Sequence, residues 1–166
     1  NPKKPNFKNR DRLILSKGHG CLALYAILAD KKFFNKKVLK SASKFESILG
    51  GHPEYGKVPG VEASTGALGH GPPIGVGMAL AAKINKLKHK SFVIVGDGEI
   101  NEGSFWESSM IASKHKLNNF HVIIDYNKIQ SLNTINESVG KVEKQFSNFI
   151  KEQSEINNIN AKRFNA

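Results

Sequence analysis

The sequence has 166 residues, of which 39% are hydrophobic and 23% charged, and this predicts one compact domain that is too small to hold two full domains. No apolar run approaches the ~20 residues of a membrane helix, and no secretory signal is visible. The single cysteine, Cys21, excludes an internal disulfide and a cysteine-based zinc site. A cytoplasmic protein is therefore expected. The net charge of +11 includes many lysines spaced along two helical stretches, which predicts solvated helix faces and no binding to nucleic acid or membranes.

The first half of the chain predicts two helices and then a long segment rich in glycine. Residues 20–29 (GCLALYAILA) are apolar enough for a buried helix, whereas residues 36–49 predict an exposed one. The inward-facing residues of the second helix would be Val38, Leu39, Ala42, Phe45 and Leu49. Glycine and proline are dense in residues 50–77. A long loop of this kind in a compact domain usually carries function.

The second half of the chain predicts a strand, a helix and a second strand. Before them, the prolines at 72 and 73 can open a helix that runs to about residue 87. Residues 91–95 (SFVIV) suit a strand buried on both faces, residues 105–116 a helix, and residues 120–125 (FHVIID) a second buried strand. The fold class is therefore α/β, a parallel sheet flanked by helices. Polar residues end both strands and should face one crevice at the carboxyl edge of the sheet.

Two of these polar residues suggest a site for a divalent cation and a diphosphate. Asp97 and Asn127 follow the two predicted strands and are 30 residues apart. A carboxylate and an amide oxygen are hard ligands suited to Mg²⁺ or Ca²⁺. Gly96 and Gly98 would let the backbone turn sharply and approach a phosphate. The alternative is a plain GDG turn between strand and helix, with Asp97 as a helix cap.

The surrounding motifs resemble those of a known family. Residues 96–130 read GDGEINEGSFWESSMIASKHKLNNFHVIIDYNKIQ, which is similar to the thiamine-diphosphate motif. The EG pair three residues after GDG and the D-x-N-K-I strand end resemble those of transketolases. Three further blocks agree in the family's order: LSKGHG at 15–20, GHPE at 51–54 and STGALGHG at 64–71. The resemblance implies a thiamine-diphosphate-binding fold, with residues 1–166 as a single, incomplete diphosphate-binding module.

The resemblance also implies which residues hold the metal and the diphosphate. Asp97, Asn127 and the backbone carbonyl of Ile129 resemble the family's ligands to Mg²⁺, and Asn127 belongs to the cofactor contacts as well. His19 resembles a histidine that contacts the diphosphate, and the N–H of Gly98 would do the same.

Other matching positions would face the rest of the cofactor, the substrate or a partner. Gly66, Ala67 and Leu68 resemble the segment along the cofactor's pyrimidine and central region. His52 resembles a histidine near the first hydroxyls of the substrate. Glu102 resembles a glutamate at the subunit interface that is linked to the partner's cofactor site. His52 and Glu102 are therefore the catalytic candidates.

The implied reaction is the transfer of a two-carbon ketol unit between sugar phosphates, in the pentose phosphate pathway. The pyrimidine-binding module, with the glutamate that activates the cofactor, is missing from these residues. An oligomer with a pyrimidine-module partner subunit is therefore expected, and the chain alone should be inactive or nearly so. Two alternatives remain: another thiamine-diphosphate enzyme (a deoxyxylulose-phosphate synthase or a 2-oxoacid dehydrogenase component), or a non-catalytic truncated remnant.

The remaining histidines and aromatic residues have plainer interpretations. His70 and His121 are expected to be structural, and His89 and His115 to be solvated on lysine-rich helical faces. Phe105 and Trp106 would pack in the core or an interface. If a partner completes the site, residues 66–77 and the Phe105-Trp106 region should form the exposed apolar parts.

Overall fold

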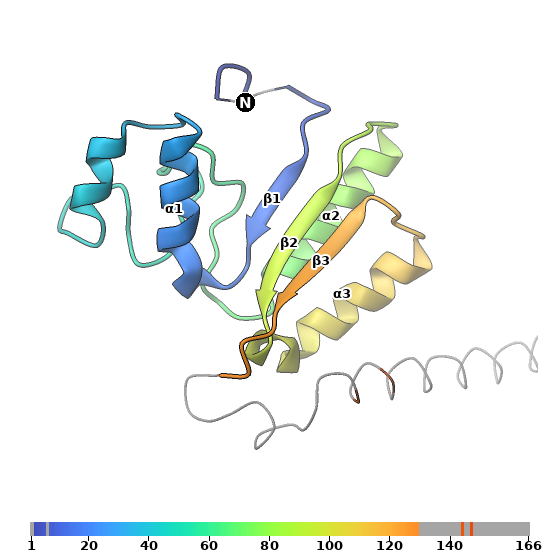
Figure 1. The fold of residues 1–166 in the computed structure, drawn as a ribbon. Helices are drawn as coiled ribbons and strands as arrows, with labels where there is room; N and C mark the ends of the chain where they lie inside the picture. The colour runs from blue at the N-terminus through green and yellow to red at the C-terminus, as the bar shows by residue number, and fades with distance from the viewer. Residues whose placement is uncertain (1, 6, 130–143, 145–146, 148–166) are drawn as a thin grey trace, which may run out of the picture. The chain divides into compact units, whose positions relative to one another are not determined.

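Three parallel strands form the centre of the structure, a computed structural model that describes residues 2–5, 7–129, 144 and 147. The chain divides into two units, Asn1–Tyr126 and Asn127–Ala166, and the helices and strands named below belong to the first. The strand order is β1-β2-β3 (Figure 1). The bounds are β1 Arg12–Leu15, β2 Ser91–Gly96 and β3 Phe120–Asp125. The sequence predicted a single module over residues 1–166, and most of its part beyond residue 129 lies outside the described residues.

Helices connect the strands, as parallel pairing requires. Their bounds are α1 Cys21–Asp30, α2 Gly71–Ile84 and α3 Gly103–Lys114. The short 3-10 helices are η1 Gly18–Gly20, η2 Lys36–Ser41 and η3 Gly98–Asn101. The α/β class and the predicted β2-α3-β3 unit are confirmed. The sequence did not predict β1, because a four-residue strand is too short to show a clear period.

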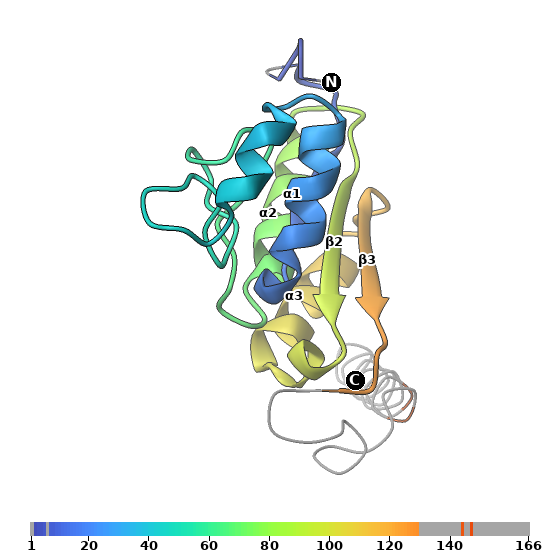
Figure 2. The ribbon, with the colours of Figure 1, turned by 60° about the vertical axis from the view of Figure 1, so that its left-hand side comes forward.

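The helices cover the sheet unequally. Figures 1 and 2 agree that α2 and α3 lie on one face of the sheet and that α1 lies beside the β1 edge. Val93 and Val95 face α2 and are fully buried, whereas the alternate residues Phe92 and Ile94 are only half-buried. On the other face, Leu13 is 42% and Ile123 is 49% exposed. The sequence predicted that β2 and β3 are both buried strands. This is wrong for the described residues, because only one face of β2 is buried and β3 has no fully buried residue.

A second core lies between α1 and the long loop. Tyr25 and Leu49 are its least exposed members, and both are fully buried. The predicted helix over residues 36–49 is wrong beyond Ser41, where η2 ends. Ser43 and Glu46 take positive φ values of 60°, which a helix does not allow.

Local hydrogen bonds and the packing of Leu49 against α1 explain this interruption of the predicted helix. The N–H of Ser43 donates to the carbonyl of Leu49 (2.8 Å), and the hydroxyls of Ser41 and Ser47 share a hydrogen bond (2.9 Å). This turn buries Leu49 and leaves Phe45 94% exposed, so the prediction that Phe45 points inward is also wrong.

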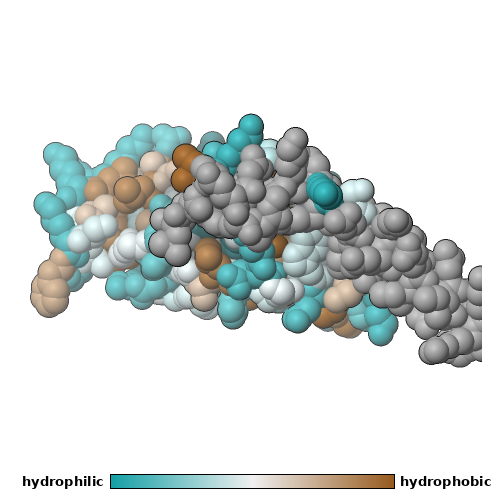
Figure 3. Space-filling view, turned by 90° about the horizontal axis from the view of Figure 1, so that it is seen from below, coloured by the Kyte–Doolittle hydropathy of each residue, from teal (hydrophilic) through white to brown (hydrophobic). Residues whose placement is uncertain are grey.

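The described surface mixes polar and apolar residues. Figure 3, seen from the carboxyl ends of the strands, shows hydrophobic and hydrophilic residues side by side. Leu68 is 47% exposed and Ile111 is 45% exposed. Among the described residues, no helix has both the length and the apolar character needed to cross a membrane.

A pair of glycines on α2 gives a direct test of how this helix packs. A Cβ added to Gly75 would meet a methyl group of Val93 and lie 2.9 Å from Cε2 of Phe120, whereas Gly77 has nothing within 4 Å. We expect Gly75→Ala to lower the free energy of unfolding by about 1–3 kcal/mol, because it overpacks the helix–sheet contact. Gly77→Ala should raise it by about 0.5–1 kcal/mol, because glycine is a poor helix former. Urea unfolding of both variants measures this, and equal effects would contradict the packing described here.

Candidate cofactor site at the carboxyl edge

Asp97 lies where the sequence predicted it, at the carboxyl edge of the sheet. It directly follows β2, and its N–H donates to the carbonyl of Asp125 at the end of β3 (3.3 Å). Its side chain is 1% exposed, and one carboxylate oxygen accepts the N–H of Gly98 (3.0 Å) at the start of η3. The capping interpretation of Asp97 is therefore observed. It does not exclude a metal role, because a carboxylate offers about four acceptor positions.

Asn127 and Ile129 belong to the second unit of the chain. Both are exposed, and the side-chain oxygen of Asn127 accepts the N–H of Ile129 (2.9 Å). No group of three or more His, Cys, Asp or Glu residues that could hold a metal occurs among the described residues. The metal ligands predicted from the sequence do not form such a group, because they are one carboxylate, one side-chain amide and one backbone carbonyl. The metal site remains a prediction.

The glycine-rich residues 65–71, hereafter the 65–71 loop, contact the end of β1. The hydroxyl of Thr65 donates to the carbonyl of Leu15 (2.6 Å), and the N–H of Gly71 donates to the hydroxyl of Ser16 (3.1 Å). A Cβ on Gly71 would lie 3.0 Å from Cα of Ser16 and closer still to its side chain. Only glycine therefore allows the loop to approach the LSKGHG segment this closely.

Two predicted histidines meet at the same place. The rings of His19 and His52 have their centroids 5.3 Å apart, and both residues are exposed. Gly66 takes a φ of 141°, and a Cβ there would lie 2.9 Å from the His52 ring. A Cβ on Gly18 would lie 2.5 Å from the same ring. Glycines on two segments thus make room for His52, and the structure brings together three of the predicted site residues, His19, His52 and Gly66.

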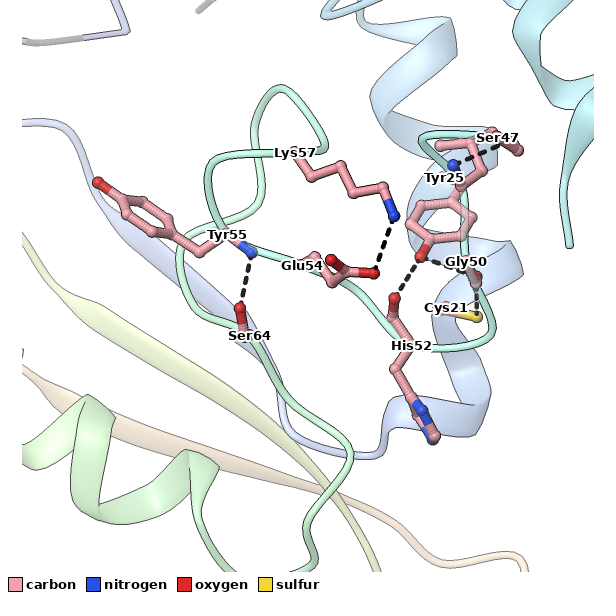
Figure 4. A network of polar contacts seen from close by, with 10 residues as sticks. Cys21, Tyr25, Ser47, Gly50, His52, Glu54, Tyr55, Lys57 and Ser64 are labelled. Carbon is pink, nitrogen blue, oxygen red and sulfur yellow. Dashed lines mark hydrogen bonds and ion pairs between the residues drawn. The ribbon is translucent and has the colours of Figure 1, made fainter. Parts of the chain in front are cut away.

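A buried tyrosine of α1 fixes the backbone that carries His52. The hydroxyl of Tyr25 donates to the carbonyls of Gly50 (3.1 Å) and His52 (2.9 Å), and the thiol of Cys21 lies 3.2 Å from the carbonyl of Gly51. Burial raises the pKa of the Tyr25 hydroxyl to about 12, so the hydroxyl stays a donor at physiological pH. Figure 4 shows the His52 carbonyl turned toward Tyr25 and its ring pointing away. The sequence did not indicate this role for Tyr25.

Glu99 is the main residue of this region that the sequence did not single out. It is 2% exposed, and its carboxylate accepts hydrogen bonds from the Ser16 hydroxyl and from the N–H groups of Gly69 (2.9 Å) and Gly96 (3.2 Å). The carboxylate therefore joins the ends of β1 and β2 to the 65–71 loop. Its place directly after GDG was the only available signal.

Lys17 and Asp125 form an ion pair, also unpredicted, that connects the ends of β1 and β3. The Asp125 side chain is 48% exposed, so the pair is expected to contribute little to stability.

The 65–71 loop also contacts the start of α3, where Glu102 lies. Gly69 has a φ of 75°, and a Cβ there would be 2.5 Å from Cβ of Glu102. The Ser104 hydroxyl donates to the Gly69 carbonyl (2.8 Å). Glu102 is exposed at the N-cap position of α3 and makes no side-chain capping bond. Its predicted interface role is untested, and the favourable helix-start position remains the plainer interpretation.

The expected apolar surface near this site is only partly present. Leu68 is 47% exposed and Ala67 is exposed, in line with the expectation. Phe105 is only 2% and Val76 only 4% exposed, so the expectation is wrong for these two residues. Phe105 packs edge-to-face on Trp106 with ring centroids 5.3 Å apart, which fits its alternative interpretation as a packing residue.

The other histidines divide between surface and interior. His115 is exposed, as predicted. His89 was predicted to be solvated, but it is 5% exposed and its Nδ1 lies 3.1 Å from the carbonyl of Lys8. His121 stacks on Phe92 with ring centroids 4.9 Å apart. His70 is exposed at the start of α2, with its Nδ1 3.0 Å from the carbonyl of Leu68.

The parallel sheet and its helices define an α/β protein, and sheets of this kind usually bind ligands at the carboxyl edge, where the glycine-rich segments of this chain meet. The model of the family described as "Transketolase, thiamine diphosphate binding domain" matches residues 1–160, and the chain belongs to the transketolase family.

Relatives and solved structures agree with this assignment. One of the subunits of the apulose-4-phosphate transketolase of Phocaeicola vulgatus is 48% identical over 136 residues, which are 82% of this chain and 48% of that protein. The transketolase of Aquifex aeolicus is 43% identical over 140 residues, 78% of this chain and 20% of that protein. The crystal structure of Campylobacter jejuni transketolase matches with a TM-score of 0.79 and 36% identity, over 87% of this chain and 24% of that one. The chain thus spans about half the length of the apulose-4-phosphate transketolase subunits that it matches.

Proposed function

We propose that this chain is the thiamine-diphosphate- and Mg²⁺-binding part of a transketolase that transfers a two-carbon ketol unit between sugar phosphates. One observation carries the proposal. The 65–71 loop contacts each of the other three motif blocks, through the bonds to Ser16 and Glu99 and the close packing against His52. Segments far apart in the sequence therefore meet at the edge where parallel sheets usually bind ligands, and this supports a shared cofactor site there.

The metal would be held by Asp97, Asn127 and the backbone carbonyl of Ile129. These oxygens suit Mg²⁺, which commonly keeps few protein ligands and takes the others from phosphate and water. The burial of Asp97 supports this role, because a buried carboxylate is stabilised by a cation. Gly96 supports it as well, since a Cβ there would meet nothing closer than 3.9 Å, and the strand end is open to a ligand.

The rest of the cofactor would lie along the glycine-rich loop. His19 and the N–H of Gly98 would contact the diphosphate, although in this structure that N–H donates to Asp97. Gly66, Ala67 and Leu68 would lie along the pyrimidine and central region of the cofactor. Thiamine diphosphate supplies the carbanion chemistry when bound. The residues of this chain would anchor and orient it, and the exposed His52 would contact the first hydroxyls of the sugar.

The reaction needs a second module, and this belongs to the proposal. Relatives from Phocaeicola vulgatus and Actinobacillus succinogenes are each named as one subunit of an apulose-4-phosphate transketolase. We infer that this chain likewise works with a pyrimidine-module subunit, in an oligomer, with Glu102 at the interface between subunits. A cytoplasmic enzyme of the pentose phosphate pathway, with no nucleic-acid or membrane partner, is the corresponding cellular role.

The choice of donor substrate tests this function against its alternatives. With the pyrimidine-module subunit, Mg²⁺ and thiamine diphosphate present, we expect turnover of a ketose phosphate with an aldose phosphate acceptor. Pyruvate as the donor should give none. Turnover of pyruvate instead would favour a deoxyxylulose-phosphate synthase or a 2-oxoacid dehydrogenase component. No turnover of either donor by the complete complex would favour a non-catalytic remnant.

A further inference from the structure

Glu99 is a buried acid that the proposed chemistry does not use. Its carboxylate, 2% exposed, has three donors, and each comes from a different segment of the candidate site. The Ser16 hydroxyl lies at the end of β1, the Gly69 N–H in the 65–71 loop, and the Gly96 N–H at the end of β2. Ser16 in turn accepts the N–H of Gly71, so the contact extends along the loop.

None of these three donors is a cation, so the carboxylate depends on hydrogen bonds for its stabilisation. A buried carboxylate is costly unless such bonds are complete, and bonds to a charged acceptor are stronger than neutral ones. A negative charge here also does not help to bind an anionic diphosphate. The observations therefore favour a geometric role for Glu99.

The arrangement of donors requires two accepting oxygens. One oxygen of Glu99 accepts from Ser16 and Gly69, and the other accepts from Gly96. Glutamine has the same shape but only one accepting oxygen, and its amide would oppose an N–H of Gly69 or Gly96. Glu99→Gln is therefore a small change in volume and a large change in hydrogen bonding.

We propose that Glu99 is a positioning residue, which holds the 65–71 loop against the ends of β1 and β2 in the conformation that binds thiamine diphosphate. The inference rests on the proposed function, because it assumes that this loop lies along the cofactor. Glu99 would act through the loop and would not contact the cofactor itself.

The first arm of the test needs no ligand. Amide hydrogen exchange of the free chain should be faster in residues 65–71 of Glu99→Gln than in the wild type. Exchange in α1, which packs in the core between α1 and the long loop, should be unchanged. Glu107→Gln is the matched control, since Glu107 is an exposed acid of α3. Unchanged exchange in residues 65–71 of a folded Glu99→Gln protein would overturn the proposal.

The second arm measures affinity for thiamine diphosphate with Mg²⁺ by calorimetry, with the pyrimidine-module subunit present. We expect Glu99→Gln to weaken binding about tenfold or more, Glu99→Asp to restore part of it, and Glu107→Gln to have no effect. Equal affinity in Glu99→Gln and the wild type would overturn the proposal. If the wild type itself fails to bind, the proposed function fails, and the exchange arm still decides whether Glu99 orders the loop.

A Glu99→Gln protein that does not fold is replaced by Ser16→Ala in the exchange arm. This variant removes one donor and leaves the carboxylate with the two backbone N–H groups. The Gly71 amide loses its own acceptor in this variant, so only the Gly69 amide, which donates to Glu99, is informative. Faster exchange of the Gly69 amide would support the positioning role, and unchanged exchange of that amide would overturn it.

Discussion

Ketol transfer should be absent from the purified chain and should appear when a pyrimidine-module subunit is added. The physical reason is that the proposed function leaves the three acids at the GDG turn and the start of α3 with other roles or positions, and none of them is assigned to the aminopyrimidine. Glu99 is enclosed by its three donors, Asp97 is proposed as a ligand to the metal, and Glu102 lies exposed at the start of α3. General acid–base groups typically contribute about 100-fold or more to a rate, so the two-chain mixture should exceed the chain alone by at least about that factor.

The assay uses a ketose phosphate, an aldose phosphate, Mg²⁺ and thiamine diphosphate. The partner subunit without this chain is the matched control and should also be inactive, because it would lack the diphosphate- and metal-binding residues. Robust turnover by a preparation of this chain shown to be free of a second polypeptide would contradict the split-site account. The activating acid would then have to lie within the 166 residues.

Asp97→Ala should abolish Mg²⁺-dependent binding of thiamine diphosphate. The change removes the one carboxylate among the proposed metal ligands, and neutral oxygens alone bind Mg²⁺ poorly. It also removes the hydrogen bond to the Gly98 N–H, a cap worth about 1 kcal/mol, which should lower stability without unfolding the protein. Calorimetric titration of the cofactor in the presence of the partner subunit measures the loss, and circular dichroism checks the fold.

His115→Ala is the control for Asp97→Ala, because His115 is exposed at the C-terminal end of α3 and its side chain is assigned no role. It should bind the cofactor as the wild type does. Asp97→Asn keeps the shape and an acceptor for Gly98, so it separates the loss of charge from the loss of the cap. Normal binding by a folded Asp97→Asn protein would show that the carboxylate charge does not hold the metal. Equal losses in Asp97→Ala and His115→Ala would indicate general unfolding.

The parts of the fold with a clear sequence period were predictable. β2, α3 and β3 follow one another with sharp changes from strand to helix patterns, and their positions agree within a few residues. Residues 36–49 show a helical pattern that the protein does not keep, because burial of Leu49 and the contact between Ser41 and Ser47 favour a turn. The packing of Leu49 against α1 is a tertiary contact that overrides local propensity, and a window of sequence around Leu49 does not show it.

The candidate site was predictable where glycine or a motif identifies it. The GDG turn, His19, His52 and Gly66 all lie in blocks that resemble the family. Glu99 was not singled out, because an acid after a strand resembles an ordinary helix-start residue. Its burial depends on Ser16, 83 residues earlier in the sequence, and on Gly69, 30 residues earlier. His89 was misread for the same reason, since its partner, the Lys8 carbonyl, is 81 residues away.

Calorimetric titration of thiamine diphosphate into the wild-type chain, with and without Mg²⁺, tests the central claim most directly. The measurement is made with the chain alone and again with its pyrimidine-module subunit. We predict saturable binding that requires Mg²⁺ and tightens when the subunit is present, with one cofactor for each copy of this chain. Binding that is indifferent to Mg²⁺, or no saturable binding even in the two-chain complex, would contradict the claim that this chain anchors the diphosphate and its metal.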